Sequence, residues 1–99
     1  MSVSAPLAAI RAQHPLLHCI SNIVSANDCA NLALAIGASP IMAQAPQEMA
    51  DIAALAGAVV LNTGTPDEAK FTAARTAGAT ANRRGIPVVL DPVGVGASP

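Results

Sequence analysis

Apolar residues in this chain gather in four short runs, at positions 16–20, 39–43, 58–62 and 87–91. The runs show little of the apolar–polar alternation of a half-exposed strand. They therefore predict strands that are covered on both faces, as in a parallel sheet. The segments between the runs repeat their apolar residues at helical spacing. Strands that alternate with helices predict an α/β domain with a mostly parallel sheet and right-handed crossovers.

Four segments carry the start and stop signals of helices. Ser4 is the expected N-cap of the first helix, which must end before Pro15 because the residue preceding a proline is disfavoured in the α region. Ser25 or Asn27 can cap the second helix. Proline opens the other two helices, and a glycine ends each of the last three. The predicted helices span 4–13, 25 (or 27)–36, 46–55 and 66–84, with Gly37, Gly57 and Gly85 as the terminating glycines.

The helical spacing also predicts which side chains face the sheet. On the third and fourth helices these are the apolar residues three or four positions apart. The expected core positions are Met49, Ile52 and Leu55 on the third helix, and Phe71, Ala74, Ala77 (or Gly78) and Ala81 on the fourth.

Polar or sulfur-containing residues stand at or just past the end of each predicted strand. They are Asn22, Met42, Asn62 and Asp91. Ligands of open α/β sheets bind outside the carboxyl ends of the strands, so these residues are candidates for one site. Two amides, a thioether and a carboxylate suit a small, neutral, partly aromatic ligand beside an anionic group. The alternative is that the asparagines cap the following turns and Met42 fills the core.

The last strand runs into a glycine-rich loop that begins at Pro92. Gly94 and Gly96 let backbone N–H groups approach an anion, which favours a phosphate or metal–phosphate site next to Asp91. A dinucleotide-binding turn is excluded, because its third glycine would stand at position 99, which is Pro99. The alternative is that an Asp-Pro turn with two glycines is an ordinary exit from a strand.

Composition narrows the class of protein. With 99 residues, 53% of them hydrophobic and 11% charged, the chain forms one domain at most, and we expect its core to be shared with further structure. Polar residues interrupt every apolar run before the roughly 20 residues that a membrane span needs. A net charge of −1, one Phe and no Trp or Tyr argue against nucleic acid as a partner.

No set of nucleophile and base is visible, so no catalytic residue is assigned in this chain. Cys19 and Cys29 lack the spacing of zinc or redox motifs and are expected as buried thiols in a reducing cytoplasm. The N-terminal residues lack the pattern of a secretory signal. His14 and His18 have no neighbouring triad pattern and are expected to be structural.

Four strings of this sequence resemble the N-terminal part of the hydroxyethylthiazole kinase family, in the same order and at the same spacing. They are HCISN at 18–22, GASPIMA at 37–43, VLNTGT at 60–65 and IPVVLDPVGVGA at 86–97. The resemblance implies a three-layer α/β/α, ribokinase-like fold with a mostly parallel sheet. It also implies a trimer with active sites between subunits, and ATP- and Mg²⁺-dependent phosphorylation of the primary alcohol of 4-methyl-5-(2-hydroxyethyl)thiazole in thiamine salvage.

By position, the resemblance implies roles for individual residues. Met42 corresponds to the methionine that contacts thiazole, and Asn22 to part of the same pocket. Asp91, with Gly94 and Gly96, corresponds to the edge that faces magnesium and phosphates, so Asp91 is the expected indirect ligand of Mg²⁺. Asn62 is added as a possible pocket residue because it stands at the end of a predicted strand.

Members of the family are much longer, and their second half carries the ATP-binding arginine and threonine and a glycine-rich loop with the catalytic cysteine or aspartate. Residues 1–99 are therefore expected to be the N-terminal, substrate-side portion of a single kinase domain, inactive alone. A gene fragment, a cleaved protein with a second chain, and a truncated relative all remain open. The alternative functions are another ribokinase-like kinase, such as one acting on a pyrimidine alcohol, and a non-catalytic ligand-binding or assembly module.

Overall fold

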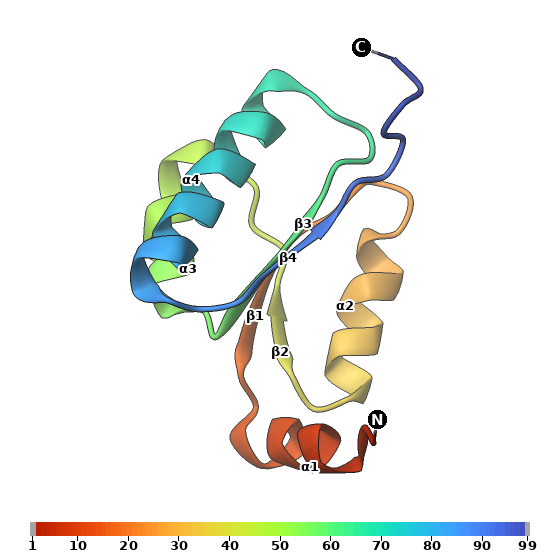
Figure 1. The fold of residues 1–99 in the computed structure, drawn as a ribbon, viewed down its shortest axis with the longest axis vertical. Coiled ribbons are helices and arrows are strands. Elements are labelled where there is room, and N and C mark those ends of the chain that lie inside the picture. The colour runs from red at the N-terminus through yellow and green to blue at the C-terminus, as the bar shows by residue number, and fades with distance from the viewer. Residues whose placement is uncertain (1, 99) are drawn as a thin grey trace.

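A parallel sheet with helices on both faces forms the body of the chain in the computed structural model, which describes residues 2–98 (Figure 1). Helix α2 covers one face, whereas α3 and α4 cover the other, and α1 lies at the end where the strands begin. The predicted α/β layering is confirmed. The elements are α1 (Ser4–Gln13), β1 (Leu16–Ile20), α2 (Ala26–Ala35), β2 (Ser39–Ile41), the 3-10 helix η1 (Pro46–Glu48), α3 (Met49–Leu55), β3 (Ala58–Asn62), α4 (Glu68–Arg84) and β4 (Val88–Asp91).

The four strands lie in the order β2-β1-β3-β4, and every neighbouring pair is parallel. The register of the sheet aligns the last residues of β1, β3 and β4. Ile20 pairs with Leu61, and Asn62 pairs with Asp91. As a result the carboxyl ends of β1, β3 and β4 lie side by side at one edge of the sheet.

The predicted cap of the first helix and the predicted start of the fourth helix need correction. Ser4 is the first residue of α1 rather than its cap, since the cap position is Val3 and no side chain caps the helix. Helix α4 begins at Glu68 because the Asp67 carboxylate accepts a 2.7 Å hydrogen bond from the Lys70 backbone N–H, the geometry of a side-chain N-cap. Strand β2 ends at Ile41, so Met42 follows it as the prediction for strand ends requires.

Glycine ends α2 and α4 as expected. Gly37 has φ +98° and Gly85 has φ +71°, in the left-handed region that side chains disfavour. Helix α3 ends differently, because the Arg84 guanidinium donates 2.8 Å hydrogen bonds to the carbonyl oxygens of Ala53 and Ala56. These bonds satisfy carbonyls that the end of a helix leaves unpaired.

The core lies between the sheet and the α3–α4 pair. Its largest fully buried side chains are Ile20, Met49, His18 and Val59. The His18 ring donates from Nε2 to the carbonyl oxygen of Ala43 at 2.9 Å, so this histidine ties β1 to the segment after β2. Alanines complete the core on the helix side, at positions 53, 56, 73, 77 and 81.

The predicted core face of α4 was partly wrong. Ala77 and Ala81 are buried and Ala74 packs against the core, but Phe71 is 42% exposed and Lys70 takes the buried position instead. The buried stripe therefore shares Ala77 and Ala81 with the predicted face, but in the first turns of the helix it runs through Lys70 and Ala73 instead of Phe71 and Ala74. Alanine suits the close approach of α4 to α3 and the sheet, which a phenylalanine ring would prevent. On α3, Leu55 is likewise 72% exposed, whereas Met49 is buried.

Alanine substitutions of the glycines that end α2 and α4 distinguish the cost of backbone strain from the cost of side-chain crowding. We expect Gly85→Ala to lower the free energy of unfolding by about 1–2 kcal/mol, because only the left-handed backbone opposes the new methyl group. Gly37→Ala should cost more, because its Cβ would also lie 3.0 Å from the Arg11 Cα. Urea unfolding of both variants measures the difference, and equal losses would contradict this account of the α1–α2 contact.

Candidate functional site

A chain of side-chain hydrogen bonds joins the ends of three strands. The Asn22 amide nitrogen donates to Asn62 Oδ1 at 3.1 Å, and the Asn62 amide nitrogen donates to Asp91 Oδ2 at 3.2 Å. The structure thus brings together three of the four residues that the sequence places at strand ends. We call Asn22, Asn62 and Asp91 the polar relay.

Backbone N–H groups fix the orientation of both amides. Asn22 Oδ1 accepts from the N–H groups of Val24 and Ser25 at 2.9 and 3.0 Å, in the turn that leads into α2. Asn62 Oδ1 accepts from the Gly64 N–H at 2.8 Å. Because each oxygen already faces backbone donors, each amide nitrogen is directed along the relay.

Gly64 is buried against the relay and leaves no room for a side chain. A Cβ at this position would lie 2.9 Å from the Asn22 amide nitrogen and 3.0 Å from Asn62 Oδ1. Real Cβ atoms essentially never approach other atoms below 3.0 Å. The close contact of the two asparagines therefore requires glycine here.

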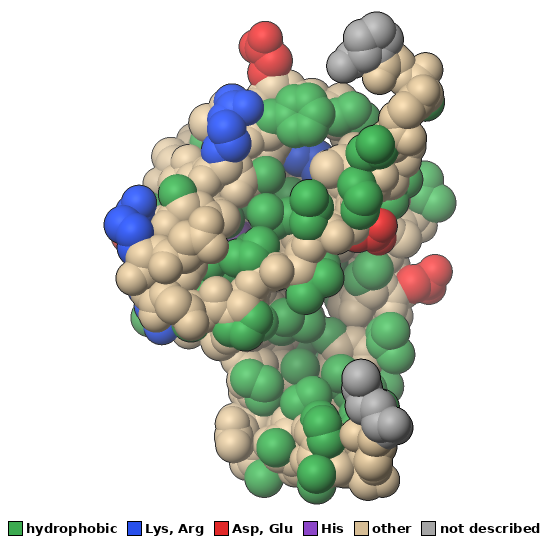
Figure 2. Space-filling model, in the orientation of Figure 1, with side chains coloured by type: hydrophobic (Ala, Val, Ile, Leu, Met, Phe, Trp, Pro, Cys, Tyr) green, Lys and Arg blue, Asp and Glu red, His purple; other side chains and the backbone are tan. Residues whose placement is uncertain are grey.

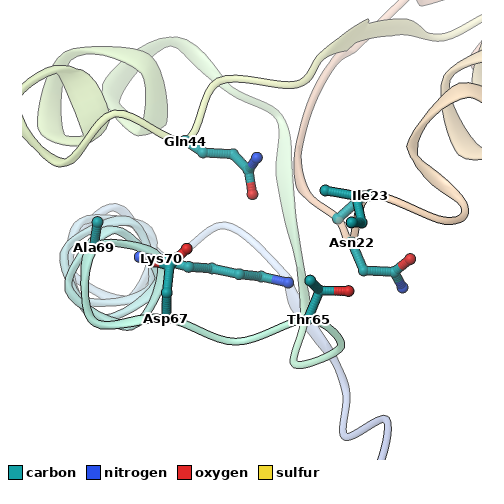
Figure 3. Close-up of a pocket in the computed structure, with 8 residues that line it drawn as sticks. Asn22, Ile23, Gln44, Thr65, Asp67, Ala69 and Lys70 are labelled. Atoms are coloured by element: carbon teal, nitrogen blue, oxygen red, sulfur yellow. Dashed lines mark hydrogen bonds between the residues drawn. The ribbon is translucent and has the colours of Figure 1, made fainter.

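A cavity of about 170 Å³ lies beside the relay and shares Asn22 with it (Figure 3). Its walls come from the segments that follow β1, β2 and β3, and from the first turn of α4. It lies at the carboxyl edge of the sheet, where ligands of such folds bind. The residues that line it are Ser21, Asn22, Ile23, Gln44, Thr65, Asp67, Ala69 and Lys70.

Lys70 is the buried charged group of this cavity, and it was not among the residues predicted from the sequence. Its side chain is 6% exposed, and its ammonium donates to the carbonyl oxygen of Gly64. Burial lowers the pKa of Lys70, and the nearby Asp67 carboxylate opposes that shift. The signal that could have found it is the alanine stripe at 73, 77 and 81, which places position 70 on the same helix face.

Thr65 has an unusual backbone for a β-branched residue. Its φ is +48°, in the left-handed region. Such a conformation costs of order 1–3 kcal/mol and tends to occur at ligand sites. Thr65 stands at the wall of the cavity next to Lys70 (Figure 3).

Other residues predicted for the site lie outside the cavity. Met42 is half-buried just past β2 and does not line it, although Gln44, two residues further on, does. Gly94 and Gly96 lie in an exposed turn with φ +76° and +95°, and a Cβ at either would meet nothing within 4 Å. They serve the turn itself, which the Thr63 hydroxyl joins to β3 by donating to the Val93 carbonyl at 2.8 Å.

The described residues 2–98 contain no group of three or more His, Cys, Asp or Glu side chains placed to hold a metal ion. Asp91 stands as an exposed carboxylate at the end of β4. Both cysteines are free thiols, and burial, followed by the effect of Cys29, raises the pKa of Cys19. A raised pKa disfavours the thiolate, so Cys19 is a poor nucleophile. Within the same described part of the chain, no helix is long and apolar enough to cross a membrane.

Comparison with known proteins identifies close relatives. A sequence model of the hydroxyethylthiazole kinase family matches residues 7–99. The hydroxyethylthiazole kinase of Methanoculleus marisnigri is 58% identical over 92 residues, which cover 93% of this chain and 33% of that protein. The enzyme of the same name from Listeria monocytogenes serovar 1/2a is 56% identical over 92 residues, which cover 93% of this chain and 34% of that protein.

A solved structure agrees with these matches. The hydroxyethylthiazole kinase protein of Pyrococcus horikoshii OT3 superposes with a TM-score of 0.92 at 45% sequence identity, covering 97% of this chain and 38% of that chain. The present chain thus spans about a third of the length of the curated relatives that it matches.

Adding a methyl group to Gly64 should break the relay. We expect Gly64→Ala to lower the free energy of unfolding by about 1–3 kcal/mol, because the asparagines must separate to admit the Cβ. Gly78→Ala is the matched control. Its Cβ would lie at an ordinary 3.5 Å from Leu61, so better helix propensity should stabilise the protein by about 0.5–1 kcal/mol. Equal effects of the two variants in urea unfolding would refute the crowding argument.

Lys70 should titrate below the usual lysine range, and it is the only lysine in the chain. We expect the ¹³Cε signal of Lys70 to titrate with a midpoint below the ordinary value of 10.5, and to return toward that value in urea. Between the two midpoints the unfolded state binds more protons, so stability relative to Lys70→Met should rise with pH there. A native midpoint at or above 10.5 would contradict the burial of the charge.

Proposed function

Because the chain belongs to the hydroxyethylthiazole kinase family, we propose that it takes part in transferring a phosphoryl group to the primary alcohol of 4-methyl-5-(2-hydroxyethyl)thiazole, a reaction of thiamine salvage. The observation that carries this proposal is the family match over residues 7–99, together with a ligand-sized cavity at the carboxyl edge of the sheet. The rest of the relatives' length is proposed to complete the domain.

In this proposal the cavity beside the relay receives the thiazole alcohol. Asn22 contacts the ligand from the end of β1, and Ile23 and Ala69 supply apolar surface. Asn62 acts mainly by holding the Asn22 amide in place through the 3.1 Å hydrogen bond. Met42 does not line the cavity in this structure, and we propose that it approaches the ring from the segment after β2, beside Gln44, when the rest of the domain is present. Positioning of this kind supplies much of the catalysis in phosphoryl transfer.

We further propose ATP as the phosphoryl donor and Mg²⁺ as its counter-ion. Asp91 fits this assignment, because Mg²⁺ is commonly held by one or two carboxylates together with water and substrate phosphates. Asp91 is exposed at the sheet edge, and Asn62 orients its carboxylate. The metal would neutralise phosphate charge, and the Gly94–Gly96 turn lies beside it in sequence. This chain does not span the full length of its relatives. We propose that the remaining part supplies both the ATP-binding residues and the catalytic cysteine or aspartate.

We propose a trimer in the cytoplasm, with the cavity at or near a subunit contact. Ile23, which lines the cavity, is 80% exposed, and Val24 and Leu32 are also exposed nearby along the chain. Figure 2 shows further hydrophobic side chains over the face that carries β4, where Val89 and Leu90 are exposed. Exposed apolar side chains in such numbers are typical of surfaces that are covered by further protein.

Loss of the relay should weaken binding of the alcohol. We expect Asn62→Ala to raise the Kd for 4-methyl-5-(2-hydroxyethyl)thiazole about 10-fold, the effect of losing roughly 1.4 kcal/mol, because Asn22 loses its partner. Asn82→Ala, an exposed position near the far end of α4, should leave the Kd unchanged. Isothermal titration calorimetry measures both.

A pyrimidine alcohol serves as the competing ligand in the same titration. Tighter binding of that alcohol would reject the thiazole assignment in favour of another small-alcohol kinase. Binding of neither alcohol would reject the substrate-binding role of the cavity.

A further inference from the structure

Lys70 is buried, although charged side chains are usually exposed to solvent. It is 6% exposed, and the one hydrogen bond that its ammonium makes among the described residues goes to the Gly64 carbonyl. An ammonium has three donors, so two remain without an acceptor in the described part of the chain. Burying a charge without a paired group is costly, and such groups are usually paired or hydrogen-bonded.

One oxygen of the nearby Asp67 carboxylate is already engaged. Asp67 is the N-cap of α4, and its Oδ1 accepts the backbone N–H of Lys70 at 2.7 Å. Figure 3 shows the Lys70 side chain reaching from α4 to Thr65, with Gln44 on one side and Asn22 beyond it. The spare donors of the ammonium therefore adjoin the cavity, and the Gln44 amide and the Thr65 hydroxyl line it as further polar groups.

We propose that Lys70 is the anion-binding residue of this cavity, where its ammonium donates to a phosphate oxygen of a small phosphate monoester. The inference rests on the proposed function, whose product is such a monoester. The position of Lys70 supports it, because the same ammonium holds Gly64, and Gly64 donates to the relay residue Asn62. Lys70 thus gives the cavity a preference for the phosphorylated ligand over the neutral alcohol.

The charge of Lys70 should make binding of the monoester depend on pH. Burial lowers the pKa of Lys70 in the free protein, and a bound anion should raise it again. By linkage, the monoester should bind more weakly as the pH rises through the titration of Lys70 in the free protein. A merely structural lysine would show no such coupling to a ligand.

The test begins with the wild-type protein and inorganic phosphate. Because Lys70 is the only lysine, its ¹³Cε signal reports on one site. We expect phosphate to shift this signal in a saturable way and to raise its titration midpoint, with sulfate acting similarly. No shift with phosphate, sulfate or the phosphate monoester of the thiazole alcohol would overturn the proposal, and this outcome requires no variant.

Variants of Lys70 then measure how much its side chain contributes to the affinity for the monoester. Lys70→Met should weaken binding of the monoester roughly 10- to 100-fold, the range of a charge-assisted hydrogen bond. Binding of the neutral alcohol, which Lys70 contacts without an ion pair, should weaken much less, so the ratio of the two Kd values is the quantity to compare. Lys70→Gln retains a donor for the Gly64 carbonyl and should show the same selective loss if charge is responsible. Arg75→Met, an exposed cation on the same helix, should change neither Kd.

The outcomes separate this inference from the proposed function. If the alcohol binds and monoester affinity is equal in wild type, Lys70→Met and Lys70→Gln, then the Lys70 proposal fails and the kinase assignment stands. If phosphate shifts Lys70 but the alcohol does not bind, the anion site stands and the thiazole assignment fails. Should Lys70→Met fail to fold, Lys70→Gln and the wild-type titration still decide the question.

Discussion

The parallel register of β1, β3 and β4 is the constraint on which the rest of the site depends. It places the ends of three strands side by side, so that Asn22, Asn62 and Asp91 meet in a chain of hydrogen bonds. Gly64 allows that contact, and its carbonyl oxygen accepts the Lys70 ammonium. One backbone arrangement therefore links the relay, the strained turn at Thr65 and the cavity.

Much of this arrangement follows from the sequence, for physical reasons that are easy to state. Uninterrupted apolar runs identify the strands, and β1 and β3 have the predicted bounds. The expected burial of every strand is wrong for β4, where Val89 and Leu90 are exposed at the edge of the sheet. Parallel strands end at one edge, so the meeting of Asn22, Asn62 and Asp91 follows from their places at strand ends. The left-handed glycines at 37 and 85 likewise follow from their places after helical segments.

The rest depends on tertiary packing that periodicity does not determine. An alanine-rich helix such as α4 has several faces that could meet the sheet, and hydrophobicity alone favours the one with Phe71. Close packing selects the alanine face instead, and that choice buries Lys70. Met42 shows a second limit, because its place after a strand does not say whether its side chain lines the cavity or lies outside it.

The central claim is that the cavity beside the relay is the site of the small alcohol. A crystal structure of the protein soaked with 4-methyl-5-(2-hydroxyethyl)thiazole tests it most directly. The account predicts density for the ring between Asn22, Gln44 and Lys70, with the relay hydrogen bonds intact. A ring bound only elsewhere, for example in the open pocket of about 420 Å³ on α4 lined by Glu68, Phe71, Thr72 and Arg75, would contradict it.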